Sequence, residues 1–308
     1  MNNSITTIIP FFNSAGCIRT MLNSILAGTI VPDEILLIDD GSTDDSASIV
    51  KNYESKYPNV HYLSQPHAGV SAARNLGISK SHGNWISFLD ADDYIESDMY
   101  ETMLNAVEGS DLAGCVCGYF TEKDGITTAY TADFPATITG EQLLEAMFLN
   151  DNVRGFLFTR LFSAQLVKQN LFDTDISMCE DLLFQSKLLC NHLSDEFGYV
   201  NMPFYHYIQN SASATNSANY FNDGVFKYKP AFTQIFDVVN KDYVWASYNS
   251  IIEYSMYTLL QAYKKGNHAV KEQIRLLQIE LKATPCQHKS KHRIAYEHAP
   301  ILFSLLSK

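Results

Sequence analysis

The sequence has little of several features that mark whole classes of protein. Charged residues make up 18% of its 308 residues, below the ~25% usual for soluble domains. Apolar residues make up 46%, which is too many for an intrinsically disordered chain. No apolar run reaches the ~18 residues that a membrane-spanning helix needs. The Gly-x-Gly-x-x-Gly loop of dinucleotide-binding enzymes is also absent. We therefore expect a folded protein with a substantial core and no membrane span.

A regular cysteine framework is missing as well. The six cysteines form no Cys-x-x-Cys pair and no Cys/His cluster of the kind that holds zinc. Free thiols in a reducing compartment are the expected state. The first ten residues lack the basic and long apolar segments of a signal peptide, so we expect a cytoplasmic location. Cys115 and Cys117 alternate along an apolar run, which predicts that they face the same side of a strand.

Basic residues are too few, and too unevenly spread, for general nucleic-acid binding. The net charge is −12, and binding to phosphates needs lysine and arginine in excess. Residues 264–308 nevertheless hold nine lysines and arginines against three acids, a balance of +6. The preceding 263 residues therefore carry −18. The chain consists of an acidic body and a basic C-terminal region.

Short apolar runs and segments with helical spacing of apolar residues alternate over the first 120 residues. Short apolar runs predict strands at 5–10, 34–39, 61–64, 85–89 and 112–120. Helical spacing predicts helices at 17–27, 46–56, 69–79 and 97–107, with Ser97 as the N-cap of the last. Strands alternating with helices over short connections indicate βαβ units and a parallel sheet with helices on both faces.

The remaining sequence predicts a less regular half and then a helical region. A hairpin or loop is expected at 123–135 and a strand at 198–207, with helices at 141–150, 163–170 and 180–190. After residue 220 the pattern predicts helices alone, at 220–239, 243–264 and 270–281. The Ser/Asn/Ala-rich stretch 211–219 predicts a boundary. We expect one domain over 1–218, divided into halves at 120/121, and a helical region over 219–308.

Two acidic clusters directly follow predicted strands. Asp39-Asp40-Gly41-Ser42-Thr43-Asp44-Asp45 follows the second strand, and Asp90-Ala91-Asp92-Asp93 follows the fourth. Ligands of open α/β sheets bind outside the carboxyl ends of the strands. Each cluster alone is also compatible with a turn and helix cap, or with a solvated loop. Three carboxylates within four residues repel one another unless a cation lies between them, and Mg²⁺ or Mn²⁺ with oxygen ligands meets that need.

Four segments together resemble the family-2 glycosyltransferases of GT-A fold. They are Ile-Ile-Pro-Phe-Phe-Asn at 8–13, Ile-Asp-Asp-Gly-Ser-Thr-Asp at 38–44, Gly-Val-Ser-Ala-Ala-Arg-Asn-Leu-Gly at 69–77 and Trp-Ile-Ser-Phe-Leu-Asp-Ala-Asp-Asp at 85–93. They occur in the family's order and spacing, within a resemblance that covers roughly 4–215. The resemblance implies an α/β, Rossmann-like fold with a mostly parallel central sheet flanked by helices. A C-terminal helical appendage would lie outside it.

The resemblance also implies a nucleobase site, usually for uracil. By position, Phe12 would stack on the base and Pro10 would line its pocket. Asp40 would accept a hydrogen bond from the base N3–H, with Asp39 nearby. An aromatic face suits a flat base, and a carboxylate pairs well with an imide N–H. The ordinary alternative for Phe12 is a core aromatic.

The other motifs correspond by resemblance to the diphosphate and metal site. Arg74 would lie near the phosphates of the donor, and the alternative is a structural ion pair with an acidic cluster. Asp90 would contact the ribose or the water shell of the metal, and Asp92 would bind Mn²⁺ or Mg²⁺ bridging the diphosphate. Asp93 would be a helper or would begin the next helix.

The second half supplies a candidate base. Glu180-Asp181 resembles the start of the family's Glu-Asp-x-x-Phe motif, which implies that Asp181 deprotonates the acceptor hydroxyl and that Glu180 orients the acceptor or Asp181. The pair could alternatively just begin a helix. Ile208 and Asn210 replace basic residues that the family often has. His206 is therefore a candidate for a metal or phosphate contact, and the alternative is a structural role, which is more common for a lone histidine in an apolar strand.

The resemblance implies a metal-dependent, inverting glycosyltransferase. It would move a hexosyl or N-acetylhexosaminyl group from a UDP-sugar to a hydroxyl of a glycan or lipid-linked acceptor, in surface polysaccharide synthesis. The alternative is a non-catalytic nucleotide-sugar-binding subunit or sensor. Basic residues at 289–293 precede an apolar run at 301–306. This pattern fits peripheral contact with the inner face of an anionic plasma membrane, or helices that pack on protein, including a second copy of the chain.

Overall fold

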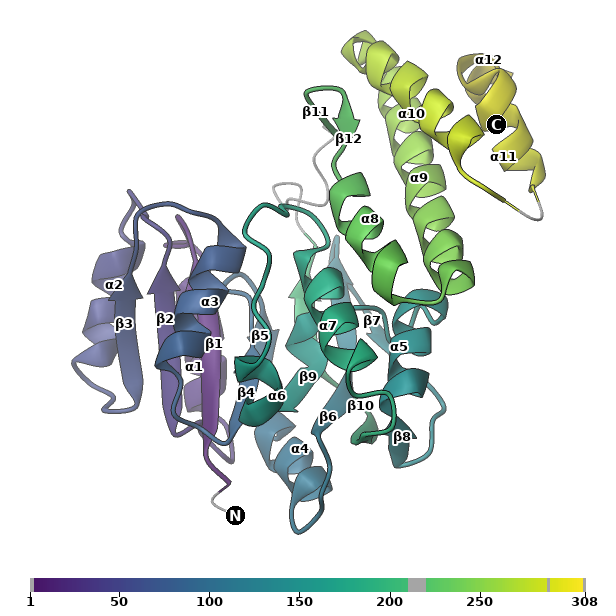
Figure 1. The fold of residues 1–308 in the computed structure, drawn as a ribbon. Helices are drawn as coiled ribbons and strands as arrows, with labels where there is room; N and C mark the ends of the chain where they lie inside the picture. Colours follow the sequence, from purple (N-terminus) through teal and green to yellow (C-terminus); the bar gives the residue numbers. More distant parts are fainter. Residues whose placement is uncertain (1–2, 210–219, 287–288, 307–308) are drawn as a thin grey trace. The chain divides into compact units, whose positions relative to one another are not determined.

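A computed structural model describes residues 3–209, 220–286 and 289–306 (Figure 1). The chain forms two compact units, Met1–Gln209 and Asn210–Lys308. The expected boundary between residues 218 and 219 falls among residues 210–219, outside the described part of the chain.

The first unit is built on a ten-stranded mixed sheet in the order β3-β2-β1-β4-β9-β6-β10-β5, with β7 beside β6 and β8 beside β10. Strands β1, β2, β3 and β4 are mutually parallel, as are β6 and β10. Strand β9 is antiparallel to both of its neighbours. The expected α/β fold with a mostly parallel sheet is confirmed. The strands are Ile5–Phe11, Glu34–Asp39, Val60–Ser64, Trp85–Phe88, Tyr94–Ile95, Gly114–Lys123, Ile126–Tyr130, Thr137–Thr139, Arg160–Ser163 and Glu196–Ile208 for β1 to β10.

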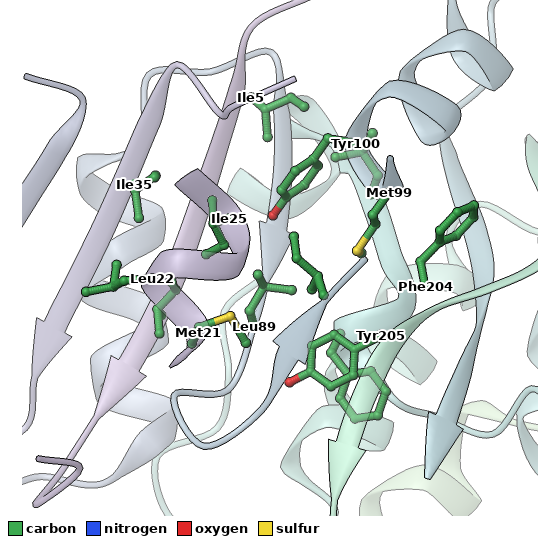
Figure 2. Close-up of a cluster of buried hydrophobic side chains, with 14 of the residues drawn as sticks. Ile5, Met21, Leu22, Ile25, Ile35, Leu89, Met99, Tyr100, Phe204 and Tyr205 are labelled. Atoms are coloured by element: carbon green, nitrogen blue, oxygen red, sulfur yellow. The ribbon is translucent and has the colours of Figure 1, made fainter. Parts of the chain in front are cut away.

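Helices cover both faces of this sheet because buried side chains of β1 alternate between them. On one face, Ile5, Ile9 and Phe11 join residues of α1 and α4 in the main core cluster, part of which is drawn in Figure 2. On the other face, Ile8 meets α3 at Gly77, where an added Cβ would lie 2.4 Å from the Ile8 side chain. The helices are Ile18–Leu26, Ser46–Glu54, Val70–Lys80, Met99–Val107, Gly140–Leu149, Ala164–Lys168 and Glu180–Cys190 for α1 to α7, with a 3₁₀ turn at Leu157–Thr159.

Among the local predictions in the first unit, the cap at Ser97 is wrong, the helix expected at 163–170 is shorter than predicted, and the hairpin expected at 123–135 is confirmed. Ser97 does not cap α4, which begins at Met99 after Asp98 and has no side-chain cap; the Ser97 carbonyl accepts the Thr29 N–H instead. The helix expected at 163–170 is a short helix preceded by strand β9, and Ser163 is the last residue of that strand. The expected break at 123–135 contains strand β7, which forms a hairpin with β6.

The six cysteines are free thiols. Cys115 and Cys117 are both buried in the main core cluster, which confirms that they share a face of strand β6. Burial raises the pKa of the Cys115 thiol to about 12, so this thiol is packed in its protonated form.

The second unit is helical after a short hairpin. Its strands β11 and β12 are Phe221–Asn222 and Val225–Phe226. The expectation of helices alone after residue 220 is therefore wrong, and the first helix begins at Lys229. Asp223 and Gly224 both have positive φ, 46° and 77°, and two such residues between short strands form a tight hairpin turn. The helices are Lys229–Val238, Lys241–Lys264, Lys271–Ala283, Lys291–His298 and Pro300–Leu306 for α8 to α12, with a 3₁₀ turn at His268–Val270.

A buried arginine joins three helices of the second unit. Arg293 is fully buried, and its guanidinium donates to Asn249 Oδ1 at 2.7 Å, to the Leu281 carbonyl at 2.5 Å and to Glu297 Oε1 at 2.8 Å. One of the basic residues in the C-terminal charge balance is therefore internal. No helix among the described residues is long and apolar enough to cross a membrane.

Candidate active site

The parallel strands bring both acidic clusters to one edge of the sheet. In the register of the central strands, Phe11 pairs with Asp39 and Ile8 with Phe88. The backbone continues this pairing beyond the strands, because the Asp40 N–H donates to the Phe11 carbonyl and the Leu89 N–H to the Ile8 carbonyl. The loops that follow β1, β2 and β4 thus begin side by side.

Asp40 is fully occupied by groups of the protein itself. Its Oδ1 accepts from Gln65 Nε2 at 2.7 Å and from the Ala68 N–H at 2.9 Å, and its Oδ2 accepts from the Gly69 N–H at 2.9 Å. His67 Nδ1 lies 2.8 Å from the same Oδ2. Burial alone would raise the pKa of Asp40, but these hydrogen bonds outweigh it and hold the pKa below its ordinary value. Asp40 therefore fastens the loop that leads into α3.

Asp39 keeps more of its bonding capacity. It is buried, and its two oxygens accept one hydrogen bond each, from the Ser42 N–H and from the Tyr62 hydroxyl, both at 2.8 Å. A carboxylate has about four acceptor positions. Of the two adjacent acids, Asp39 is thus the one with acceptor positions left for a ligand.

Phe12 presents an aromatic surface beside these acids. Its side chain is 44% exposed, which excludes the core alternative. Its ring lies against that of His67, with centroids 4.6 Å apart, while Pro10 is buried within β1. The sequence reasoning missed His67. Its position two residues before Gly69, in the segment that leads into the α3 motif, was the available signal.

Arg74 connects helix α3 to the second acidic cluster and to the start of helix α7. It is buried in α3, and its guanidinium donates to Glu180 Oε1 at 2.8 Å and to Asp90 Oδ1 at 3.1 Å. Burial lowers the pKa of Arg74, but Asp90, Glu180 and Asp181 together outweigh burial and raise it above its usual range. The structural ion pair with an acidic cluster, the alternative expected for Arg74, is present through Asp90, and Arg74 also binds Glu180, the neighbour of the candidate base Asp181.

Within the Asp90–Asp93 turn, Asp92 and Asp93 have different surroundings. Asp92 is exposed, and partial desolvation together with Asp90 raises its pKa. Asp93 is buried, where it accepts from the Tyr205 hydroxyl at 2.5 Å and from the Ile208 N–H at 2.7 Å. Burial, followed by Asp90 and Asp92, raises the pKa of Asp93 to about 8. Burial and the neighbouring carboxylates thus favour the neutral form of Asp93.

A divalent cation bound by the remaining carboxylates would need further oxygen ligands from a substrate. Among the described residues, no group of three or more His, Cys, Asp or Glu side chains is placed to hold a metal ion. Asp90 and Asp92 are two oxygen donors whose repulsion raises the pKa of Asp92, and a cation would relieve that repulsion. Magnesium commonly uses one or two carboxylates plus phosphate oxygens and water. The chemistry of this pair is compatible with such a site.

His206 is committed to other acids. Its Nδ1 lies 2.8 Å from Glu122 Oε1 and its Nε2 lies 2.9 Å from Glu96 Oε1. Its ring is stacked between those of Tyr94 and Phe120, with centroids 4.1 and 4.4 Å away. With both nitrogens bound to carboxylates, His206 has no free nitrogen for a metal, and the structural interpretation is favoured.

Glu180 and Asp181 begin helix α7, whose N-cap is Cys179 in a left-handed conformation at φ 59°. Asp181 is half-buried and accepts from the Leu182 N–H at 2.7 Å. Burial and the neighbouring Glu180 raise the pKa of Asp181 to about 7, against the opposing effect of Arg74. A carboxylate that titrates near neutral pH has the proton affinity that suits a general base.

The amino-acid sequence matches a glycosyltransferase family and several bacterial proteins. The profile of the family described as "Glycosyl transferase family 2" matches residues 6–172. The chain is 41% identical over 115 residues to the "Uncharacterized glycosyltransferase YibD" of Escherichia coli, which covers 37% of this chain and 33% of that protein. It is 30% identical over 226 residues to the "Cholesterol galactosyltransferase" of Borreliella burgdorferi, covering 69% of this chain and 62% of that one.

A similar fold is found among solved structures. Residues 1–349 of TarS from S. aureus, solved in complex with UDP-GlcNAc, superimpose with a TM-score of 0.66 and 19% identity, covering 98% of this chain and 89% of that one. At this identity the likeness concerns the fold. The matched region spans 33%, 31%, 62% and 60% of the first four sequence relatives, so these proteins extend well beyond it.

Proposed function

The chain belongs to glycosyl transferase family 2, and from this premise we propose that it is a metal-dependent, inverting transferase that uses a UDP-sugar. The group moved would be a hexosyl or N-acetylhexosaminyl group, and the acceptor a hydroxyl of a glycan or lipid-linked saccharide in surface polysaccharide synthesis. The observation that carries the proposal is the position of Arg74, which joins the donor-side acid Asp90 to Glu180 beside the candidate base. Residues that we assign to the donor side and to the acceptor side thus bind the same buried guanidinium.

The nucleobase would bind at the ends of β1 and β2. The exposed ring of Phe12 offers a stacking surface next to His67, and base–aromatic stacking contributes about 1–3 kcal/mol. Asp39, with acceptor positions left, would take the imide N–H, and Asp40 would hold the loop that carries His67. The UDP-GlcNAc complex of TarS supports a UDP-sugar as the donor class.

The diphosphate would lie over the second acidic cluster. We propose that Asp90 and Asp92 hold Mn²⁺ or Mg²⁺, which when bound neutralises the charge that develops on the departing nucleoside diphosphate. Arg74 contributes a second positive charge, held in place by Glu180. Since the carboxylates at this edge would otherwise repel a phosphate, these cations make the site compatible with an anionic donor.

Asp181 would act as the general base. Its carboxylate takes the proton of the acceptor hydroxyl while the hydroxyl oxygen attacks the anomeric carbon, and the sugar–phosphate bond breaks on the opposite side. Glu180 bonds to Arg74 and raises the proton affinity of Asp181. The position of Asp181 at the start of α7, directly after the Glu180 that binds Arg74, supports this assignment.

The decisive experiment is the hydrolysis of a panel of UDP-sugars in the presence of Mn²⁺, with UDP binding measured by titration calorimetry. Asp181→Asn should lower hydrolysis by roughly 10²–10⁴-fold and leave UDP binding within about twofold. Asp175→Asn, an exposed acid in the loop before α7, is the matched control. Normal hydrolysis by Asp181→Asn would show that the base is another residue. UDP binding by the wild type without hydrolysis of any donor would favour the non-catalytic sensor.

We further propose that the second unit meets an anionic membrane at the inner face of the plasma membrane, where a lipid-linked acceptor would lie. Lys271, Arg275 and Lys282 lie on one exposed face of α10 together with Ile279. Exposed lysines beside apolar side chains favour anionic lipid surfaces. Helix α12 adds exposed leucines at 302 and 305.

Vesicle co-sedimentation of the full chain tests this contact. Binding to vesicles of anionic phosphatidylglycerol should exceed binding to phosphatidylcholine vesicles by at least tenfold, and Lys271→Glu with Lys282→Glu should remove the difference. The control is the double variant Lys51→Glu with Lys56→Glu in the first unit. Equal binding to both vesicles, together with a dimer in ultracentrifugation, would instead show that these helices pair with a second copy.

A further inference from the structure

The turn that carries Asp90 and Asp92 is held from one side by the end of strand β10. The Tyr205 hydroxyl accepts the Asp90 N–H at 3.2 Å and donates to Asp93 Oδ2 at 2.5 Å. The Ile208 N–H, from the same strand end, donates to Asp93 Oδ1 at 2.7 Å. Three hydrogen bonds thus reach both ends of a four-residue turn from a strand more than 100 residues away in the sequence.

Tyr205 is itself rigidly placed. Its side chain is fully buried, and its ring is stacked on that of Phe158 with centroids 3.9 Å apart and planes 9° apart. Figure 2 shows the ring among the buried side chains of the core, with the hydroxyl at its outer end. Strand pairing fixes the backbone, since Tyr205 pairs with Tyr119 of β6 and Ile95 of β5. The hydroxyl cannot move without the strand.

We infer that Tyr205 is a positioning residue that sets the spacing of Asp90 and Asp92 for a divalent cation. The inference rests on the proposed function. Like charges two residues apart repel, and the hydroxyl of Tyr205 opposes the opening of the turn by bonding to residues on both sides of Asp92. Its contribution is to the affinity for metal and diphosphate, because the hydroxyl bonds to the turn that carries the two proposed ligands.

The test is Tyr205→Phe in the full chain, which removes the hydroxyl and keeps the stacked ring. The measurement is UDP binding by titration calorimetry over a series of Mn²⁺ concentrations, and it does not depend on turnover. We expect the Mn²⁺ concentration for half-maximal UDP binding to rise by about tenfold, the lower end of what residues behind metal ligands contribute. UDP binding without metal should stay within twofold of the wild type.

Strand β10 offers a matched control. Tyr199 is also buried, and its hydroxyl accepts the Ala132 N–H at 2.7 Å. Tyr199→Phe thus removes an equivalent bond at the other end of the strand, and the Mn²⁺ dependence should stay within twofold. A second pair of variants guards against misfolding. Asp93→Ala loses both bonds and should shift like Tyr205→Phe. In Asp93→Asn the side-chain oxygen can accept the Ile208 N–H while the NH2 group donates to the Tyr205 oxygen, so this variant should remain near the wild type.

The outcomes separate the inference from the function it rests on. If the wild type needs Mn²⁺ for UDP binding and Tyr205→Phe and Asp93→Ala both match it, the positioning role is overturned and the proposed metal site stands. If both tyrosine variants shift equally, the effect is one of general stability, and the positioning role is again overturned. If the wild type binds UDP identically with and without Mn²⁺, the metal-dependent function fails and this role fails with it.

Discussion

Two acids of the same sheet edge, Asp40 and Asp92, differ in how the protein surrounds them. Asp40 is buried and receives four internal contacts from residues 65–69, and its pKa lies below the ordinary value. Asp92 is exposed. Apart from its own backbone N–H, no described group donates a hydrogen bond to its carboxylate, and its pKa lies above the ordinary value. The fold stabilises the ionised form of Asp40, whereas a bound cation would stabilise the ionised form of Asp92.

The difference shows that neighbouring acids of similar sequence context can serve opposite purposes. A lowered pKa means that the ionised group favours the folded state, and a raised pKa means that it opposes folding. Asp40 should therefore contribute to stability and Asp92 to function. Substitutions at these two acids, and at the residues that act beside them, would break or confirm this division.

Removal of the exposed acid should affect activity alone. Asp92→Ala should lower Mn²⁺-dependent hydrolysis of the donor by roughly 10²–10³-fold, because a ligand of the charge-neutralising cation is lost. The free energy of unfolding, from urea denaturation without metal, should change by less than about 0.5 kcal/mol. Asp45→Ala, an exposed acid of the first cluster, is the control and should change neither. A drop in stability with normal hydrolysis would reverse the proposed division.

Removal of the buried acid should affect stability. Asp40→Ala leaves the Gln65, Ala68 and Gly69 donors without their acceptor, and each lost partner costs about 1–3 kcal/mol. We expect the free energy of unfolding to fall by roughly 3 kcal/mol at pH 7. Since the pKa of Asp40 is lowered in the fold, its contribution is present above the unfolded pKa and disappears as the pH falls through the folded pKa. The difference between wild type and variant should accordingly shrink in acid, as urea titrations at several pH values would show.

The pH dependence of turnover should report a third acid, Asp181. Its pKa of about 7 means that the deprotonated base of the free enzyme is depleted below neutral pH, so kcat/KM for hydrolysis should fall about tenfold per pH unit there. Glu180→Gln removes a charge that raises this pKa and should shift the midpoint to lower pH. A midpoint that stays unchanged in Glu180→Gln would assign the titration to another group.

The smallest effect is expected at the aromatic surface beside Asp40. Phe12→Ala should raise the dissociation constant of UDP by about 5–10-fold, which corresponds to ~1–1.4 kcal/mol of lost stacking, with no change in Mn²⁺ dependence. Tyr57→Ala, a comparably exposed aromatic on the turn after α2, should have no effect. A change in the Mn²⁺ dependence would place Phe12 at the second cluster instead.

The parallel half of the fold was predictable because its strands are continuous apolar runs. Strand β2 occupies Glu34–Asp39 and helix α7 occupies Glu180–Cys190, both as expected. Strand β9 was missed because it begins with Arg160. A fully buried arginine argues against a central strand, and only the structure shows its partners, Gln185 Oε1 at 3.1 Å and the Arg154 carbonyl at 2.8 Å.

The candidate site was predictable in its residue types but not in its contacts. The rule for parallel strands placed Asp39 and Asp90 at one edge. It could not reveal that Arg74 binds Glu180 across 106 positions of sequence, or that the acceptor positions of Asp40 are filled by the loop before α3. Those contacts join chain segments that meet only in the folded state, so local sequence patterns do not indicate them.

The left-handed conformation of Cys179 limits which sequences can occupy this position. At φ 59° a residue other than glycine, asparagine or aspartate is strained by about 1–2 kcal/mol. A library of all substitutions there should retain glycine and asparagine and lose valine and isoleucine, even though the side chain takes no part in the proposed chemistry. Cys179→Gly should raise the melting temperature. The position immediately before the Glu180–Asp181 pair is thus one where mutational tolerance is set by backbone geometry, and where an engineer could gain stability without altering either acid.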